Sequence, residues 1–321
     1  MELLQHPEDR GYPVEYLLSR IRGRRSRMIT NWKRLVFDIS PFDHLLSEKS
    51  GRVIEDKSPE VMWSNLVREY RWAYVQMNGH LREMFSPFFL YSELKTLFIC
   101  LRHVNDKKAG RIDELLSVSL FSNAIKDVLL MSVDVPSAIA GIERIFSAYS
   151  IKFAGLREVF ESDGLRSVEQ RLTNTYLTMT MQERLQPLMK KFFMRLIDSR
   201  NIISTYKFLR LESKALPAFT EGGNVPRERY TEITDQKDLF GLVSLVSDVT
   251  GIIVETIDPT QMEIALYKGI TRFLKRAGRD PLGVGLILDY LWRCSIEAMN
   301  LSILFYSREL ERDEVAAELV Q

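Results

Sequence analysis

Apolar residues recur along most of the chain at three-, four- and seven-residue steps, which is the spacing of one face of an α-helix. In residues 14–37 this stripe comprises Leu17, Ile21, Met28, Trp32 and Leu35. Similar stripes predict further helices over 59–78, 87–104, 122–131, 136–148, 166–212, 258–277 and 282–312. The one segment with a strand-like pattern is "GIIVETI" at 251–257. We therefore predict an all-α fold.

Three long apolar helices share one pattern, in which an acid is followed by a polar residue, by aliphatic residues and then by a base. Their sequences are "FFLYSELKTLFICLRHV", "FFMRLIDSRNIISTYKFLRL" and "ILDYLWRCSIEAMNLSILFYSREL". The acids Glu93, Asp198 and Glu297 lie 105 and 99 residues apart, close to a third of the 321-residue chain. The spacing predicts three helical modules, at residues 1–113, 114–221 and 222–321.

The repeated pattern supplies a set of candidate site residues. They are Glu93, Arg102, Asp198, Asn201, Lys207, Glu297, Asn300 and Arg308. An acid and an amide three positions apart share a helix face, so Asp198 and Asn201 can bond each other or hold neighbouring helix ends. Acid–base catalysis instead requires two carboxylates in one cleft, and nothing in the sequence brings these acids together. We favour a structural joint over a catalytic role.

Two glycines in "DPLGVGLILDYLW" suggest a phosphate-binding loop at first sight. A dinucleotide fingerprint needs a third glycine after a strand, but position 288 is Leu and the preceding segment has helical periodicity. We therefore interpret Gly283 and Gly285 as positions where a helix approaches its neighbour closely.

Composition and cysteine usage narrow the class of protein further. The chain is 45% hydrophobic and 27% charged with a net charge of +1, so the whole molecule has no electrostatic attraction to nucleic acid or an anionic membrane. The cysteines and the four histidines are scattered, which predicts no metal site, no disulfide framework and a reducing compartment. The start lacks a signal peptide's apolar segment, and Asp248 and Asp289 interrupt the most apolar runs. We predict a soluble protein without a cofactor.

A basic stretch near the start is the first candidate interaction surface. Residues 20–34 contain no acid and carry Arg20, Arg22, Arg24, Arg25, Arg27, Lys33 and Arg34. This can be a solvated face, a source of ion pairs to distant acids, or a grip on a partner's carboxylates and carbonyls. Nucleic-acid binding is disfavoured because no domain-wide basic field and no base-stacking aromatics accompany the arginines.

A second candidate surface is the loop "LPAFTEGGNVPRERY". Gly222 and Gly223 predict a left-handed turn before a helix opened by Pro226. The loop is either an ordinary connection between modules or a rim that touches a partner.

The repeat and three of its motifs resemble the C subunit of V/A-type rotary ATPases, whose eukaryotic homologue is subunit d. The motifs are "YLLSRIRGRRSRMI" (16–29), "DSRNIISTYKFLRLESKALPAFTEGGNV" (198–225) and "DPLGVGLILDYLWRCSIEAMNLSILF" (280–305). They look like that family's Arg-x-Arg helix, its central acid-x-x-Asn-Leu helix with a Gly-Gly loop, and its C-terminal helix. The first repeat departs from the pattern with Thr96 in place of Asn, and the third has Tyr306 where the second has Lys207.

The resemblance implies a non-catalytic adaptor of the central stalk. In this family, three pseudo-symmetric helical modules form a funnel around a central cavity. One end rests on the membrane proteolipid ring, and the cavity receives the rotor shaft of subunits D and F. The chain would be monomeric in isolation, present once in the complex, and cytoplasmic but attached peripherally to the membrane. It would transmit torque for proton or sodium transport, with no small-molecule substrate.

An unrelated α-helical repeat scaffold that binds a protein partner is the alternative, and an enzyme is the third hypothesis. The adaptor predicts modules around one axis, whereas repeats of a scaffold stack more often as a solenoid.

Overall fold

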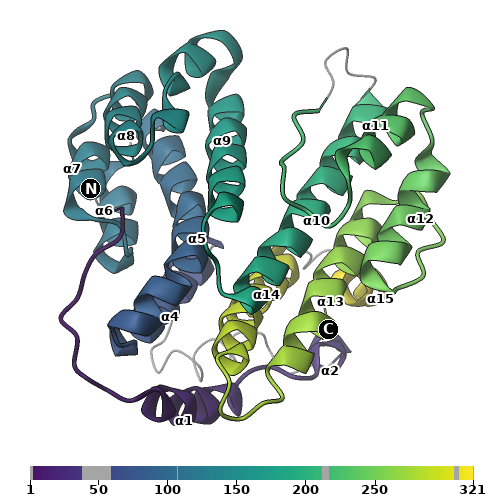
Figure 1. Cartoon of the computed structure of the whole chain (residues 1–321), viewed down its shortest axis with the longest axis horizontal. Coiled ribbons are helices and arrows are strands. Elements are labelled where there is room, and N and C mark those ends of the chain that lie inside the picture. The colour runs from purple at the N-terminus through teal and green to yellow at the C-terminus, as the bar shows by residue number, and fades with distance from the viewer. Residues whose placement is uncertain (1–2, 38–58, 107, 212–216, 307–310, 321) are drawn as a thin grey trace. The chain divides into compact units, whose positions relative to one another are not determined.

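The computed structural model describes residues 3–37, 59–106, 108–211, 217–306 and 311–320. Within these ranges the chain forms α-helices and one short 3₁₀-helix with no strand, which confirms the predicted all-α class. The elements are α1 (Val14–Arg25), α2 (Trp32–Phe37), α4 (Pro59–Gln76), α5 (Gly79–Asn105), α6 (Ala109–Val118), α7 (Asn123–Met131), α8 (Val135–Tyr149), η1 (Ile151–Phe153), α9 (Leu156–Gln182), α10 (Pro187–Leu211), α11 (Arg227–Asp235), α12 (Leu239–Thr250), α13 (Pro259–Ala277), α14 (Gly285–Tyr306) and α15 (Arg312–Glu318) (Figure 1).

The chain divides into two compact units. Unit 1 comprises Met1–Tyr12, Val67–Phe193 and Thr220–Gly222, and unit 2 comprises Pro13–Leu66, Met194–Phe219 and Gly223–Gln321. The division into three modules, their pseudo-symmetry and the funnel stay predictions.

Helix α5 is the central element of unit 1, where α6, α8 and α9 pack against it. The helix begins where the Asn78 side chain accepts a hydrogen bond from the Leu81 amide, which satisfies a donor that a helix start leaves unpaired. Edge-to-face contacts join Tyr70 and Tyr74 to Phe88 and Phe89, with ring centroids 5.0–6.0 Å apart. The aromatic rings thus fix how α4 and α5 pack.

The same helix is the one described element long and apolar enough to cross a membrane. Its most apolar window has a mean hydropathy of 1.3, and 56% of that window is buried inside the protein. Two charged residues of α5, Arg82 and Glu93, are also buried, and the Arg82 guanidinium donates to the carbonyls of Tyr74 and Glu8. We therefore assign α5 to the core of unit 1.

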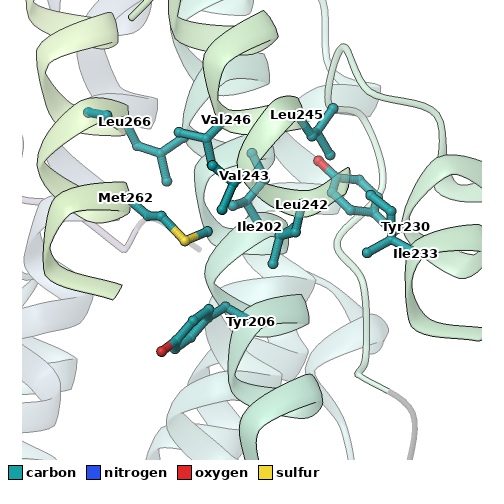
Figure 2. Packing of buried hydrophobic residues seen from close by; sticks show 11 residues of the cluster. Ile202, Tyr206, Tyr230, Ile233, Leu242, Val243, Leu245, Val246, Met262 and Leu266 are labelled. Atoms are coloured by element: carbon teal, nitrogen blue, oxygen red, sulfur yellow. The ribbon is translucent and has the colours of Figure 1, made fainter. Parts of the chain in front are cut away.

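The main core of unit 2 lies between α10, α11, α12 and α13 (Figure 2). Its buried members are Ile202, Tyr206, Tyr230, Ile233, Leu242, Val243, Leu245, Val246, Met262, Ala265 and Leu266. Burial of these side chains is the main force that holds the four helices together. A smaller cluster of Trp32, Met62, Leu301 and Leu319 packs α2 against α14 and the C-terminal segment.

The helix predicted over 14–37 is wrong as a single element. Helix α1 ends at Arg25 and α2 begins at Trp32, although the apolar stripe continues across the gap. The reason is local, because the Asn31 side chain accepts a hydrogen bond from the Arg34 amide at 3.0 Å and so caps a new helix.

Two other expectations are corrected in the same way. The stretch 166–212 is broken at 183–186, where the Gln186 side chain accepts hydrogen bonds from the amides at the start of α10. The segment "GIIVETI" is not a strand but the connection between α12 and α13. Gly251, in the left-handed region at φ 65°, ends α12 there.

Close approach explains the glycines around the start of α14. A Cβ at Gly285 would lie 2.4 Å from the carbonyl oxygen of Ala277, and a Cβ at Gly278 would lie 2.9 Å from the side-chain Cβ of Asp289. The end of α13 therefore packs directly against the start of α14, in agreement with the interpretation of Gly285 as a packing position.

We expect Gly285→Ala to lower the free energy of unfolding by about 1–3 kcal/mol, because the added methyl overlaps backbone that cannot move aside cheaply. Gly23→Ala in α1 is the matched control, since a Cβ there meets nothing within 4 Å. That change should be neutral or stabilise by up to about 1 kcal/mol, as alanine favours a helix interior. Urea denaturation of both variants measures the difference, and equal stabilities would contradict the packing role.

Candidate functional site

The first repeated acid, Glu93, is buried in α5 and holds the loop that follows α6. Its carboxylate accepts hydrogen bonds from the Leu120 amide at 2.6 Å and from the Ser119 hydroxyl at 2.8 Å. The Ser119 hydroxyl in turn accepts the Phe121 amide at 3.1 Å. Burial is the largest influence on this carboxyl and raises its pKa, while the donated hydrogen bonds act in the opposite direction.

The second repeated acid, Asp198 of α10, holds the segment that directly follows Gly223 in unit 2. One carboxylate oxygen accepts the Val225 amide at 3.1 Å. The other accepts the Asn224 amide at 3.1 Å and the Asn224 side-chain amide at 2.8 Å. Burial raises the pKa of this carboxyl as well, and the hydrogen bonds from Asn224 and Val225 oppose the rise.

The loop glycines have separate reasons to be glycine. Gly222 adopts φ 98°, which a residue with a side chain rarely adopts. A Cβ on Gly223 would lie 2.2 Å from a carboxylate oxygen of Asp198, so only glycine lets the loop approach the acid. The predicted left-handed turn is present at Gly222.

The two acids therefore perform the same local task. Each accepts hydrogen bonds from a loop whose bonded residues lie 26 and 27 positions further along the chain. This common geometry gives the sequence repeat a physical basis, because both helices carry a buried carboxylate that ties down the following connection.

The third repeat performs a related task with two residues. The Glu297 carboxylate accepts the Ile29 amide at 3.3 Å and so holds the segment between α1 and α2. Asn300 is fully buried, donates to the Val320 carbonyl at 2.8 Å and accepts the Val320 amide at 3.1 Å. The acid and the amide thus hold different segments.

The other repeat residues do not share one environment. Arg102 forms a two-pronged ion pair with Glu169, at 3.1 and 2.7 Å, and its side chain stays 61% exposed. Lys207 is exposed, and Asn201 is buried one turn after Asp198. Arg308 lies outside the described residues.

An ion-pair network that the sequence analysis missed lies at the start of α14. Asp289 is fully buried, and its carboxylate pairs with Arg25 of α1 at 3.0 Å and with Arg293 of α14 at 3.0 Å. The available signal was a single acid inside an apolar run with a base four residues later. The partner Arg25 could not be found this way, because it lies far away in the sequence.

The arginines of the basic stretch are thus not equivalent. Arg25 belongs to the Asp289 network, and the Arg22 guanidinium donates to the Pro281 carbonyl. Arg20 is exposed and donates to the Tyr16 hydroxyl at 2.9 Å on its own helix. Arg24 is half-buried and Arg27 is exposed. Binding of a partner by Arg20, Arg22, Arg24, Arg25, Arg27, Gly222 and Gly223 stays a prediction.

This arrangement positions backbone segments. Each repeated acid lies among the donors of its own loop or segment, and no group of three His, Cys, Asp or Glu side chains suited to a metal ion occurs among the described residues.

A comparison with protein-family models matches residues 43–318 to the family described as ATP synthase (C/AC39) subunit. A search of curated proteins finds no match. The matched range includes all three repeated acids, and it begins after the basic stretch at 20–34. The match supports the resemblance to the C subunit of V/A-type rotary ATPases over the alternative of an unrelated repeat scaffold.

The Asp198 joint predicts a specific pH dependence. Asp198→Asn should lower the free energy of unfolding at pH 7 by about 1–3 kcal/mol, because the amide turns one acceptor into a donor that faces N–H groups. Because the pKa of Asp198 is raised above its unfolded value of about 3.9, the folded wild type takes up its proton first as the pH falls. The wild type should therefore gain stability relative to Asp198→Asn as the pH falls through the raised folded value.

Urea denaturation at several pH values measures the difference in free energy of unfolding between the wild type and Asp198→Asn. Asp248→Asn, at an exposed position in the same unit, is the control. If this difference becomes smaller as the pH falls, the hydrogen bonds outweigh burial in their effect on the pKa of Asp198.

The Asp289 network predicts a large loss of stability. Asp289→Asn should cost about 3 kcal/mol, near the lower end for a broken buried pair, because Arg25 and Arg293 keep 27% and 26% side-chain exposure. Glu232→Gln breaks the exposed pair with Arg229 and should cost less than about 0.5 kcal/mol. Thermal or urea unfolding compares the two, and similar small losses would rule out a structural role for the network.

Proposed function

Because the chain belongs to the ATP synthase (C/AC39) subunit family, we propose that it is the non-catalytic central-stalk adaptor of a V/A-type rotary ATPase. In this role it connects the D–F rotor shaft to the membrane proteolipid ring and transmits torque for ATP-coupled proton or sodium transport. The observation that carries the proposal is the family match over residues 43–318, which spans most of the chain.

The local structure supports a mechanical role. An adaptor under torque has to keep its connecting loops fixed to its long helices. Glu93, Asp198 and Asn300 each bind backbone groups of a distant segment, so these joints resist displacement even where loop side chains differ. Hydrogen bonds to buried charged groups are stronger than those between neutral groups, which suits such a joint.

The proposed partners follow from the same role. The chain would be present once per complex, monomeric in isolation, cytoplasmic, and attached to the membrane through the complex. The basic helix α1 and the residues just after it form the surface that we assign to partner binding, with Arg20, Arg24 and Arg27 as the residues to test. Guanidinium groups bind carboxylates and carbonyls at the polar contacts that a reversible shaft socket needs.

The test is a pull-down of the purified chain with the D–F shaft from the same genome. We expect the wild type to bind and the triple change of Arg20, Arg24 and Arg27 to Ala to weaken binding at least about tenfold, since each lost charged contact costs about 1 kcal/mol or more. The matched control changes the exposed arginines Arg166, Arg171 and Arg184 of unit 1 to Ala and should bind like the wild type.

Equal binding by both triple variants would remove α1 from the shaft interface and leave the adaptor role standing. No binding by the wild type would contradict the adaptor role itself.

A further inference from the structure

Unit 2 contains a small pocket that is lined in part by the segment joining α1 to α2. It has a volume of about 340 Å³ and lies between residues 28–32 and the facing sides of α13 and α14. Its lining includes the apolar side chains of Met28, Ile29 and Ile296 together with the basic side chains of Arg272, Lys275 and Arg293. The volume is at the lower end of the range for small-molecule sites.

The charges around this pocket are unbalanced. Among the described residues, Arg272 and Lys275 form no ion pair with any carboxylate, and the Arg272 guanidinium only reaches the Gly251 carbonyl at 3.5 Å. Arg293 shares the single carboxylate of Asp289 with Arg25. The one acid that lines the pocket is Glu297, which accepts the Ile29 amide.

Neighbouring lysines extend the positive region. Burial lowers the pKa of Lys268, one turn before Arg272 on α13, and the positive charges of Lys33 and Arg272 lower it further. Among the described residues that line the pocket, the three bases Arg272, Lys275 and Arg293 thus outnumber the one acid, Glu297. Such clusters cost folding energy, so they are typical of sites where a bound anion supplies the missing charge.

We propose that this pocket binds the phosphate group of a small molecule. Guanidinium and ammonium groups are the side-chain groups that proteins use for phosphate, and Arg272, Lys275 and Arg293 provide both kinds in the lining of the pocket. The apolar lining residues Met28, Ile29 and Ile296 would cover the organic part attached to the phosphate. The site goes beyond the adaptor role, which requires no small ligand, and it uses residues other than Arg20, Arg24 and Arg27, which we assign to partner binding.

The test is isothermal titration of the full chain with three soluble probes: pyrophosphate, ADP, and short-chain dihexanoylphosphatidylglycerol. We expect saturable one-site binding of at least one probe. Changing Arg272 and Lys275 together to Gln should weaken it at least about tenfold, because two charge-assisted contacts are lost. Changing Arg276 and Arg279 to Gln removes equal charge from exposed positions that do not line the pocket, and should leave binding unchanged.

A change of opposite sign makes the test sharper. Glu297→Gln removes the one acid of the pocket but keeps an acceptor for the Ile29 amide, so it should tighten binding of the same probe. In the wild type, the largest amide chemical-shift changes on adding the probe should fall in residues 28–32 and 293–297.

The probes also separate the sources of the phosphate. Equal affinity for all three supports a free phosphate ion, tighter binding of ADP supports a nucleotide, and tighter binding of the lipid supports a membrane headgroup. The proposal is overturned if no probe binds saturably or if both double variants weaken binding equally. Each of these results leaves the shaft pull-down unaffected, so failure here is distinct from failure of the adaptor role.

Discussion

The fold depends on one constraint, which is that a carboxylate placed inside an apolar helix interface has to find donors. Removing such a charge from water is costly, and amide groups of a nearby loop are the partners that offset the cost. Glu93 and Asp198 meet the constraint in the same way, with a loop that returns to the helix after 26 or 27 residues. The course of each loop is therefore specified by the acid on the helix.

These joints also divide the work of stabilisation. Apolar clusters such as the one around Leu242 and Met262 supply the main driving force for folding. They do not require one exact orientation of the packed side chains, because the free energy of burial depends on the apolar area removed from water. Hydrogen bonds from Glu93, Asp198 and Asn300 are directional and select one loop position among many. Burial raises the pKa values of the Glu93 and Asp198 carboxyls and the donated hydrogen bonds lower them, so each joint sets a desolvation cost against directional contacts.

The sequence allowed the class and much of the helix pattern to be predicted, because apolar periodicity is a local signal. It failed where a local cap outweighed that signal, as at Asn31 and Gln186, which begin new helices inside continuous stripes. It also identified the repeated acids but not what they bind, because the Val225 and Leu120 amides are backbone groups that leave no mark in the sequence. The Arg25–Asp289 pair was missed for another reason, since only the folded chain brings its members together.

The carboxylates of Glu93 and Asp198 bind mainly main-chain amides, and this has a consequence for how such a protein diverges. A main-chain donor is supplied by every residue except proline, so the loops can change most of their side chains and keep the joint. In the second repeat, a substitution at Asp198 or at Gly223 affects the other position, because a side chain at 223 would overlap the carboxylate of Asp198. Related chains can therefore lose nearly all recognisable similarity in their loops while the same connections are preserved. The same reasoning accounts for the repeat in this chain, whose copies differ widely in sequence.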